Sequence, residues 1–146
     1  MQSKIVFANK SDVQEILKFI TELAVFEKLE HEVSVTIEKL TATLFGEKKY
    51  AEVIFLEVGT TKAGFALFFH NYSTFLGQPG IYLEDLYVRP QFRGKGYGKK
   101  LLSHLASITM DRGCGRLEWS VLDWNTPAIE FYRTQNAVSM SDWTVQ

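Results

Sequence analysis

The sequence predicts one α/β domain, in which a mixed and mostly antiparallel sheet is covered by helices on both faces. First, 146 residues with 46% hydrophobic content suffice for one substantial core. Second, strand-like segments rich in branched and aromatic side chains come between segments of helical periodicity. Third, a short turn joins two of the strands, whereas a helix joins two others in a parallel crossover. We expect residues 1–146 to form this single domain, with the final strand region truncated at the chain end.

The first half of the chain is predicted to contain a strand and two helices. Residues 4–8 form a strand candidate. Ser11 and Gln14 then fit a capping box at the start of a helix whose apolar residues recur at three- and four-residue steps. A shorter helix is expected over residues 36–45, with a threonine as its N-cap. Gly46 is expected to end this helix in the left-handed conformation.

Three longer strands are predicted to follow. Residues 50–58 and 63–70 are rich in Val, Ile, Phe and Leu, and the four residues between them fit a hairpin turn. Residues 71–80 are expected to form a polar loop that contains glycine and proline. The third strand, residues 81–88, ends before Pro90, because proline cannot donate a hydrogen bond to a strand ladder.

The last third of the chain alternates helix and strand. A glycine-rich turn leads into a helix over residues 97–112, which is followed by a strand over residues 116–121. A further helix over residues 126–135 begins with Thr-Pro, where the missing proline N–H costs nothing. Residues 141–145 are expected to form a last strand. The predicted order of elements is therefore β-α-α-β-β-β-α-β-α-β.

Composition and charge exclude several classes of function. No run approaches the roughly 20 apolar residues of a membrane-spanning helix, and no signal peptide is recognisable. A formal net charge of −1 attracts neither nucleic acid nor an anionic membrane. Cys114 is the single cysteine, so it has no partner for an internal disulfide, and the three histidines lack metal-ligand spacing. We expect a cytoplasmic protein without a metal, a nucleic-acid partner or a membrane association.

The strongest functional signal is the glycine-rich segment at residues 91–99, between a strand and a helix. Gly94, Gly96 and Gly98 stand at alternate positions, which lets the backbone curl with its N–H groups inward, beside the positive end of the helix dipole. Such a turn can hold a phosphate or pyrophosphate. The spacing fits neither a Walker A loop nor a dinucleotide fingerprint. An ordinary solvated turn is the alternative.

Two further signals lie outside this segment. Tyr132 belongs to the helix that starts near Pro127 and can face the same side as the helix start, where its phenol could donate a proton. A half-buried aromatic side chain with a satisfied hydroxyl is the alternative. Glu84 and Asp85 are expected on opposite faces of an otherwise apolar strand, where burying both carboxylates is costly. A functional role and a structural role explain this pair about equally well.

Two motifs follow each other along the chain, Gln91-x-x-Gly94-x-Gly96 and then Asn125-x-Pro127-Ala128-x-x-Phe131-Tyr132. Together they resemble the GNAT superfamily of acetyl-CoA-dependent N-acetyltransferases. Within it, residues 23–27, 82–88, 92–98 and 124–132 are most similar to the diamine (spermidine/spermine) and thialysine acetyltransferases. The resemblance implies the GNAT fold, acetyl-CoA as cosubstrate, a small-molecule amine as acceptor, direct attack in a ternary complex, and a homodimer.

The resemblance also implies a role for each matching residue. Tyr132 would be the catalytic acid that protonates the departing thiolate, and Glu84 would bind the amine or help to take its proton through water. A bulge in strand 81–88 would direct a backbone N–H at the developing oxyanion. The cofactor-binding residues would be Leu86, Tyr87, Val88, Arg93, Gly94, Lys95, Gly96, Tyr97, Gly98, Lys99, Asn125, Thr126, Pro127 and Ala128. The substrate-binding residues would be Phe26, Glu27, Glu84, Glu118, Trp119 and Ser120.

The chain departs from the family pattern at three points. Phe26 stands where the polyamine enzymes carry tyrosine, Asn136 replaces the usual glycine after the last helix, and the chain ends within the final strand. A polyamine, diamine or lysine analogue, which carries a second positive charge, fits the acidic residues expected partly on the acceptor side: Glu27, Glu30, Glu32, Glu84 and Asp85. A non-catalytic acyl-CoA-binding module and an acetyltransferase for protein N-termini or lysines are the alternatives.

Overall fold

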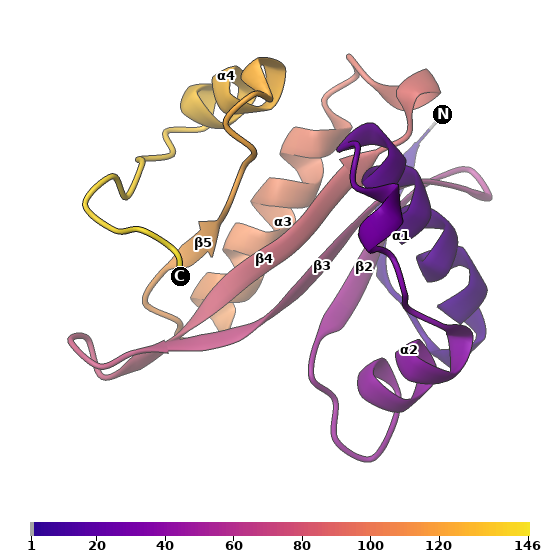
Figure 1. The fold of residues 1–146 in the computed structure, drawn as a ribbon, viewed down its shortest axis with the longest axis horizontal. Coiled ribbons are helices and arrows are strands. Elements are labelled where there is room, and N and C mark those ends of the chain that lie inside the picture. Colours follow the sequence, from indigo (N-terminus) through magenta and orange to yellow (C-terminus); the bar gives the residue numbers. More distant parts are fainter. Residues whose placement is uncertain (1) are drawn as a thin grey trace.

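A five-stranded sheet separates two layers of helices (Figure 1). The computed structural model describes residues 2–146. The strands lie in chain order across the sheet, as β1 (Ser3–Phe7), β2 (Glu52–Val58), β3 (Thr61–Ser73), β4 (Gln78–Val88) and β5 (Leu117–Trp119). Neighbours from β1 to β4 are antiparallel, whereas β4 and β5 are parallel and are connected through helix α3 (Tyr97–Asp111). The predicted fold class, a mixed sheet with one crossover, is confirmed.

Helices cover both faces of this sheet. One layer consists of α1 (Val13–Phe26) and α2 (Ile37–Leu44), and the other of α3 with α4 (Thr126–Thr134) beside it. Three short 3₁₀ turns connect the elements: η1 (Lys10–Asp12), η2 (Glu30–Glu32) and η3 (Pro90–Phe92). In the part of the chain that the structure describes, no helix is long and apolar enough to cross a bilayer.

Strand β2 shows how the sheet carries two separate cores. Val53 and Phe55 belong to the core beneath α1 and α2, whereas Ile54 and Leu56 belong to the core beneath α3. All four side chains are buried. A strand buried on both faces reads as a continuous apolar run, which is why this segment shows no alternation in the sequence. The two cores hold the sheet as a rigid support for the longer strand β4.

Strands β4 and β5 pair over three residues only and then diverge. The register joins Ile81 to Leu117 and Leu83 to Trp119, with one pair between them. Beyond Leu83, within residues 2–146, β4 has a strand partner only on its β3 side. Figure 1 shows the chain after β5 turning away from β4 toward α4. The divergence leaves one edge of β4, from Glu84 to Val88, free for backbone pairing with a ligand.

A β-bulge lies at the point of divergence. Leu67 of β3 pairs with Asp85 and the next residue, Phe68, pairs with Leu83, so Glu84 has no partner in the ladder. Leu83 and Leu86 both pack into the α3 core although they are three residues apart, a spacing that a regular strand does not allow. Glu84 and Asp85 therefore both lie toward the α1 layer. The predicted bulge is confirmed, and the expectation of opposite faces is wrong because the bulge absorbs one residue.

The structure also corrects the expected loop at residues 71–80. Strands β3 and β4 continue as a paired ribbon until Ser73 lies opposite Gln78, and only the four residues between them form the turn. Gly77 occupies that turn with φ of 64°. The polar composition of the segment predicted a loop because this end of the ribbon is largely solvent-exposed, but its backbone groups are still satisfied by cross-strand hydrogen bonds.

The start of the first helical segment differs from its predicted cap. The carboxamide oxygen of Asn9 accepts a hydrogen bond from the Ser11 N–H at 2.9 Å, and the carboxylate of Asp12 accepts one from the Asn9 N–H at 2.9 Å. The capping box is thus formed by Asn9 and Asp12, and it caps turn η1 ahead of α1. The predicted box at Ser11 and Gln14 is wrong because asparagine competes as a cap two residues earlier.

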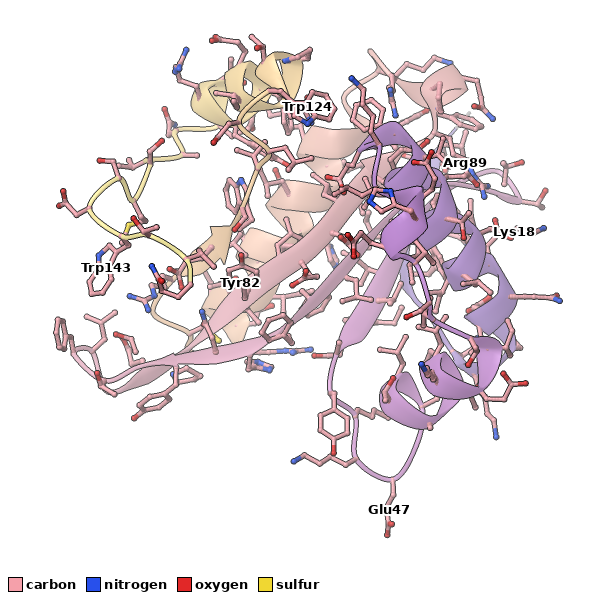
Figure 2. All side chains as sticks on the ribbon, in the orientation of Figure 1. Lys18, Glu47, Tyr82, Arg89, Trp124 and Trp143 are labelled. Carbon is pink, nitrogen blue, oxygen red and sulfur yellow. The ribbon has the colours of Figure 1, made fainter. Side chains whose placement is uncertain are left out.

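Two predictions at the ends of segments are also wrong. Gly46 is not left-handed, and it is needed for a different reason, since a Cβ there would lie 2.2 Å from the carbonyl oxygen of Ala42. Residues 141–145 form no strand. Trp143 in this segment is 74% exposed and points away from the sheet (Figure 2). A segment does not form a strand when no neighbouring edge pairs with it.

Candidate active site

The glycine-rich segment forms an open turn at the start of α3. Gly94 and Gly96 have φ of 77° and 81°, a region that glycine occupies without strain, and Gly96 is the N-cap of α3. A Cβ built on either residue would meet nothing within 4 Å, so the space above the turn is open. Backbone N–H groups and the helix dipole both favour an anion in this space. The glycine turn thus has the open backbone that the sequence predicted, and phosphate binding at this turn stays a prediction.

Arg93 ties this turn to β4 and α1. Its Nε donates to the carbonyl oxygen of Val88 at 2.8 Å, and its guanidinium lies 5.0 Å above the ring of Phe26 and 5.3 Å above that of Tyr87. Arg89, one position after β4, instead pairs with two glutamates of α1. Within residues 2–146, Arg93, Lys95, Lys99 and Lys100 are exposed and form no ion pair, and Lys100 donates instead to the hydroxyl of Ser3.

Helix α4 begins beside the glycine-rich turn. The side chain of Asn125 caps it by accepting a hydrogen bond from the Ala128 N–H at 3.4 Å, and Pro127 occupies its first turn. A Cβ on Gly98 of α3 would lie 3.6 Å from the ring of Phe131, so the two helices approach closely. The motif at residues 125–128 and the glycine-rich turn therefore flank the same region, next to the free edge of β4.

Tyr132 of α4 is half-buried in this region. Its ring lies 5.1 Å from that of Trp119 and 5.4 Å from that of Phe131. Burial, together with the negative charge of Glu27, raises the pKa of Tyr132 to about 12. The phenol is therefore protonated at neutral pH and is able to donate a proton.

An aromatic bridge, made by Phe26, Tyr87 and Trp124, joins the end of α1 to the loop before α4. The ring of Phe26 lies 6.4 Å from that of Tyr87 and 6.2 Å from that of Trp124. Lys28 places its ammonium 4.9 Å from the Trp124 ring centroid. Figure 2 shows Trp124 between α4 and the end of α1. Sequence analysis placed Phe26 at the acceptor site but gave no sign that Trp124 would meet it.

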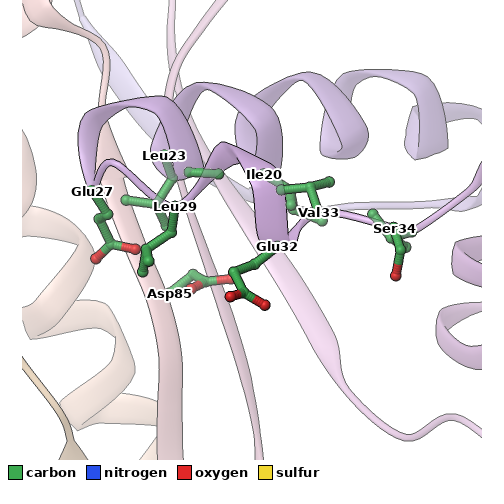
Figure 3. Close-up of a pocket in the computed structure, with 10 residues that line it drawn as sticks. Ile20, Leu23, Glu27, Leu29, Glu32, Val33, Ser34 and Asp85 are labelled. Carbon is green, nitrogen blue, oxygen red and sulfur yellow. The ribbon is translucent and has the colours of Figure 1, made fainter.

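A cavity of about 330 Å³ lies between the end of α1, the segment that follows it and the bulge of β4 (Figure 3). Its charged lining side chains are Glu27, Glu32 and Asp85, and no basic side chain lines it. The remaining lining residues are Ile20, Leu23, Ala24, Leu29, Val33, Ser34 and Val35. This acidic cavity has apolar walls and three carboxylates, which suits an alkyl chain that carries positive charge.

The carboxylates of the acidic cavity repel one another. Burial, followed by the charges of Glu84 and Glu27, raises the pKa of Asp85 to about 7. Burial and the charge of Glu84 also raise the pKa of Glu27. Within residues 2–146, Asp85 has neither an ion pair nor a side-chain hydrogen bond. A half-buried carboxylate without a cationic partner is an attractive site for a ligand ammonium.

The remaining residues expected at the acceptor site are divided between the two faces of the sheet. Glu118 accepts hydrogen bonds from Asn71 at 2.9 Å and from Arg116 at 2.8 Å. The hydroxyl of Ser120 lies 2.6 Å from that of Tyr82. Trp119 packs against the α3 core instead. Of the predicted substrate-binding residues, Glu27 lines the acidic cavity. Glu32 and Asp85 line it as well; sequence analysis counted both among the acidic residues of the acceptor side but gave neither a binding role.

Within residues 2–146, no group of three or more His, Cys, Asp or Glu side chains has an arrangement that holds a metal ion. This includes the acidic cavity, where three carboxylates line one space without converging as ligands.

Comparison with known proteins identifies the class. The model of the acetyltransferase (GNAT) family matches residues 14–136. Thialysine N-epsilon-acetyltransferase of Caenorhabditis elegans is 39% identical over 138 residues, covering 94% of this chain and 84% of the relative. L-ornithine N5-acetyltransferase of Arabidopsis thaliana is 32% identical, covering 98% and 82%. An integron cassette protein of V. cholerae has the same fold, with a TM-score of 0.83 and 24% identity, covering 100% of this chain and 91% of that one.

The chain therefore belongs to the acetyltransferase (GNAT) family and is an N-acetyltransferase. The resemblance derived from the sequence is confirmed, including the likeness to thialysine acetyltransferases. The family match spans the end of β4, the glycine-rich turn and α4, which are the elements that surround the free edge.

The raised pKa of Asp85 predicts a pH-dependent loss of stability. In the folded protein the carboxyl group of Asp85 stays protonated up to about pH 7. In the unfolded chain it loses its proton near the ordinary aspartate pKa of 3.8. The contribution of Asp85 to stability is therefore fully present below about pH 3.8 and is lost as pH rises through 7. We expect Asp85→Asn to raise Tm by several degrees at pH 8 and by less than about 1 °C at pH 4, as measured by calorimetry. The control variant Asp142→Asn changes an exposed residue and should leave Tm unchanged at pH 4 and at pH 8. An equal gain in Tm for Asp85→Asn at the two pH values would contradict the raised pKa of Asp85.

Proposed function

We propose that this protein transfers the acetyl group of acetyl-CoA to a primary amine of a small molecule that carries a second positive charge. Polyamines, diamines and lysine analogues belong to this class. The observation that carries the proposal is the acidic cavity, which shares Asp85 with the free edge of β4 and is lined by no cation. The amine attacks the thioester directly, in a complex that holds both substrates.

The open turn and the free strand edge support acetyl-CoA as the cosubstrate. Its pyrophosphate fits the turn at Gly94 and Gly96, where no atom obstructs approach to the backbone. Its pantetheine arm is suited to pair with the backbone of Leu86, Tyr87 and Val88, whose edge lacks a strand partner. Residues 125–128 at the start of α4 then lie next to its thiol end. Arg93, Lys95, Tyr97 and Lys99 surround the phosphates.

Different side chains and backbone groups of the protein carry out the separate steps of the reaction. Tyr132, which is protonated at neutral pH, donates its proton to the sulfur as the C–S bond breaks. The bulge at Glu84 frees backbone groups of β4 to stabilise the oxyanion. Glu27 and Glu84 attract the cationic acceptor, and the ring of Phe26 closes one side of its path. Positioning of amine and thioester supplies much of the rate.

The relatives support this class of acceptor. The named acceptors, thialysine and ornithine, each carry two amino groups. One ammonium of such a molecule can remain charged among the carboxylates while the other loses its proton and reacts. Phe26 lacks the hydroxyl of the tyrosine expected in polyamine enzymes, which favours a short diamine or thialysine-like amino acid over spermine. Glu118, Trp119 and Ser120 contribute, in this proposal, to the outer part of the acceptor path.

We also propose that the protein acts in the cytoplasm as a homodimer. Apolar side chains in the C-terminal segment are exposed and would be covered by a second copy: Val138, Met140, Trp143 and Val145. The single cysteine is compatible with a reducing compartment. Sedimentation velocity would measure the dimer directly.

The first test concerns the glycine-rich turn. Gly96→Val would place a branched side chain where phosphates approach the backbone, and we expect acetyl-CoA affinity to fall by at least about tenfold. Gly77→Val is the matched control, because Gly77 has φ of 64° and equally open surroundings but lies at the tip of the β3–β4 hairpin. Calorimetric titration with CoA measures both. Unchanged affinity in a folded Gly96→Val protein would contradict the site.

A second test concerns the acid. Tyr132→Phe should lower kcat by about 10²–10⁴-fold with little change in KM for acetyl-CoA. Tyr50→Phe is the control, since Tyr50 is 61% exposed in the segment between α2 and β2 and does not line the acidic cavity. Thiol release measures turnover. If the kcat of Tyr132→Phe stays within about threefold of that of the unaltered protein, Tyr132 only packs against its neighbours and is not the acid.

A third test concerns the acceptor. A thiol-release assay over thialysine, ornithine, short diamines, spermine, monoamines and histone-like peptides should give the highest kcat/KM for a dicationic small molecule. Glu27→Gln and added salt should each raise its KM, because both weaken charge attraction. Glu30→Gln, a neighbouring change outside the cavity lining, should have little effect. The proposal is rejected if monoamines without a second charge, or peptides, give the highest kcat/KM.

A further inference from the structure

We propose that Arg116 and Glu118 together hold the α-carboxylate and the α-ammonium of an amino-acid acceptor. This inference rests on the proposed function, and it narrows the acceptor from any dicationic amine to an α-amino acid whose side chain ends in an amine. The proposed function places Glu118 in the outer part of the acceptor path and gives Arg116 no role. The two side chains are in contact, so they present one positive and one negative group next to each other.

This arginine–glutamate pair lies on the same face of the sheet as the acidic cavity. Leu83 of β4 and its partner Trp119 of β5 pack into the α3 core. Tyr82 and its partner Glu118 precede them by one position and therefore face the other way, toward the side on which Asp85 lies. Figure 2 shows Tyr82 between β4 and β5, outside the part of this face that α1 and α2 cover.

The contacts of the pair leave its binding groups free. Oε1 of Glu118 accepts hydrogen bonds from Nδ2 of Asn71 at 2.9 Å and from Nε of Arg116 at 2.8 Å. Within residues 2–146, Oε2 of Glu118 and the two terminal nitrogens of Arg116 have no partner. Those nitrogens form the planar fork that binds a carboxylate through two hydrogen bonds. Oε2 is then available to an ammonium.

Asn71 and Gly80, which are paired in the β3–β4 ribbon, fix the orientation of Glu118. A Cβ on Gly80 would lie 2.4 Å from Oδ1 of Asn71, so a larger residue there would displace the side chain that reaches Glu118. Oδ1 of Asn71 is buried without a hydrogen-bond partner in the part of the chain that the structure describes. An unpaired buried acceptor costs free energy, and the hydrogen bond that orients Glu118 accounts for its retention.

The distance from the pair to the bulge of β4 suits an amino acid with a short alkyl chain. Asp85 lies three residues after Tyr82, the partner of Glu118, which is about 10 Å of strand. A few methylene groups cover most of this distance, so the terminal amine of the acceptor reaches the bulge while its α-carbon stays beside Arg116. The rings of Tyr82 and Phe69, whose centroids are 5.4 Å apart, offer an apolar surface to the methylene groups.

The pair also distinguishes an amino acid from a diamine of the same length. A diamine supplies an ammonium to Glu118 but nothing to Arg116, whose positive charge repels it. An amino acid supplies a partner to each side chain, with its two charged groups on one carbon atom. Loss of the Arg116 charge should therefore weaken binding of the amino acid and spare the diamine.

The test compares ornithine with putrescine, its decarboxylated counterpart, in a thiol-release assay. The unaltered protein should have the higher kcat/KM for ornithine. Arg116→Met should lower the ornithine-to-putrescine ratio of kcat/KM by at least about tenfold, through KM for ornithine, because one charge-assisted pair is lost. KM for acetyl-CoA should stay unchanged. Arg116→Lys keeps the charge and should recover part of the ratio.

Arg112→Met is the matched control. Arg112 also pairs with a glutamate, Glu52, at 2.6 Å, but its guanidinium lies 5.8 Å from the ring of Phe68 in the α3 core, on the other face of the sheet. Its loss should leave the ornithine-to-putrescine ratio unchanged even where it lowers Tm.

Altered substrates test each half of the pair in a protein that folds normally. Ornithinamide lacks the carboxylate, so the unaltered protein should use it less well than ornithine, whereas Arg116→Met should not distinguish the two. Nα-acetylornithine lacks the α-ammonium, and Glu118→Gln should reduce the preference for ornithine over this compound.

Three results would overturn the inference: an unchanged ratio in Arg116→Met, an equal loss for ornithine and putrescine, or a higher kcat/KM for putrescine in the unaltered protein. Acetylation of putrescine in any of these cases would still support the proposed function. Failure of the unaltered protein to acetylate any amine would instead reject the proposed function.

Discussion

The β-bulge at Glu84 is the constraint on which the rest of the site depends. It moves one residue out of the ladder, so Leu86 stays in the α3 core while Asp85 turns toward α1. Bulges also increase local twist, and the pairing of β4 with β5 ends at the residue just before this one. The bulge therefore frees the edge of β4, exposes the backbone groups of that edge and directs the carboxylate of Asp85 into the acidic cavity. Without it, the strand would be regular and the two carboxylates would lie on opposite faces.

The acidic cavity lowers the stability of the empty protein, and the two cores offset that cost. An ionised Asp85 costs at most a few kcal/mol above neutral pH, because its pKa is raised to about 7 by burial and by its neighbours. Burial of one phenylalanine contributes about 1.5–3 kcal/mol, and Phe19, Phe55 and Phe65 are fully buried together beneath α1. Repulsion between carboxylates is thus tolerated, and a cation bound among them would relieve it.

Sequence analysis succeeded where structure is set by near neighbours along the chain. Gly94 and Gly96 form the expected turn because positive φ is a property of the residue itself. It failed where structure depends on distant partners. Glu27, Glu32 and Asp85 were expected partly on the acceptor side, but the sequence did not indicate that these three would line one cavity. The face of Asp85 depends on a register shift against β3. The prediction of a strand at residues 141–145 failed for the same reason, because a strand needs the edge of another strand with which to pair.

Lys28 shows how the end of α1 is held to the loop before α4. It is a non-glycine residue with φ of 62°, a conformation that costs about 1–2 kcal/mol. Its contact with Trp124, which is 48% exposed, contributes about 0.5–1 kcal/mol and does not offset that cost alone. The hydrogen bonds from the N–H of Lys28 to Val25 and from that of Leu29 to Ala24 complete the end of α1 and supply the remainder. The strained conformation of Lys28 is therefore tolerated because it ends α1. It also places the ammonium of Lys28 over the ring of Trp124, in the loop that leads into α4.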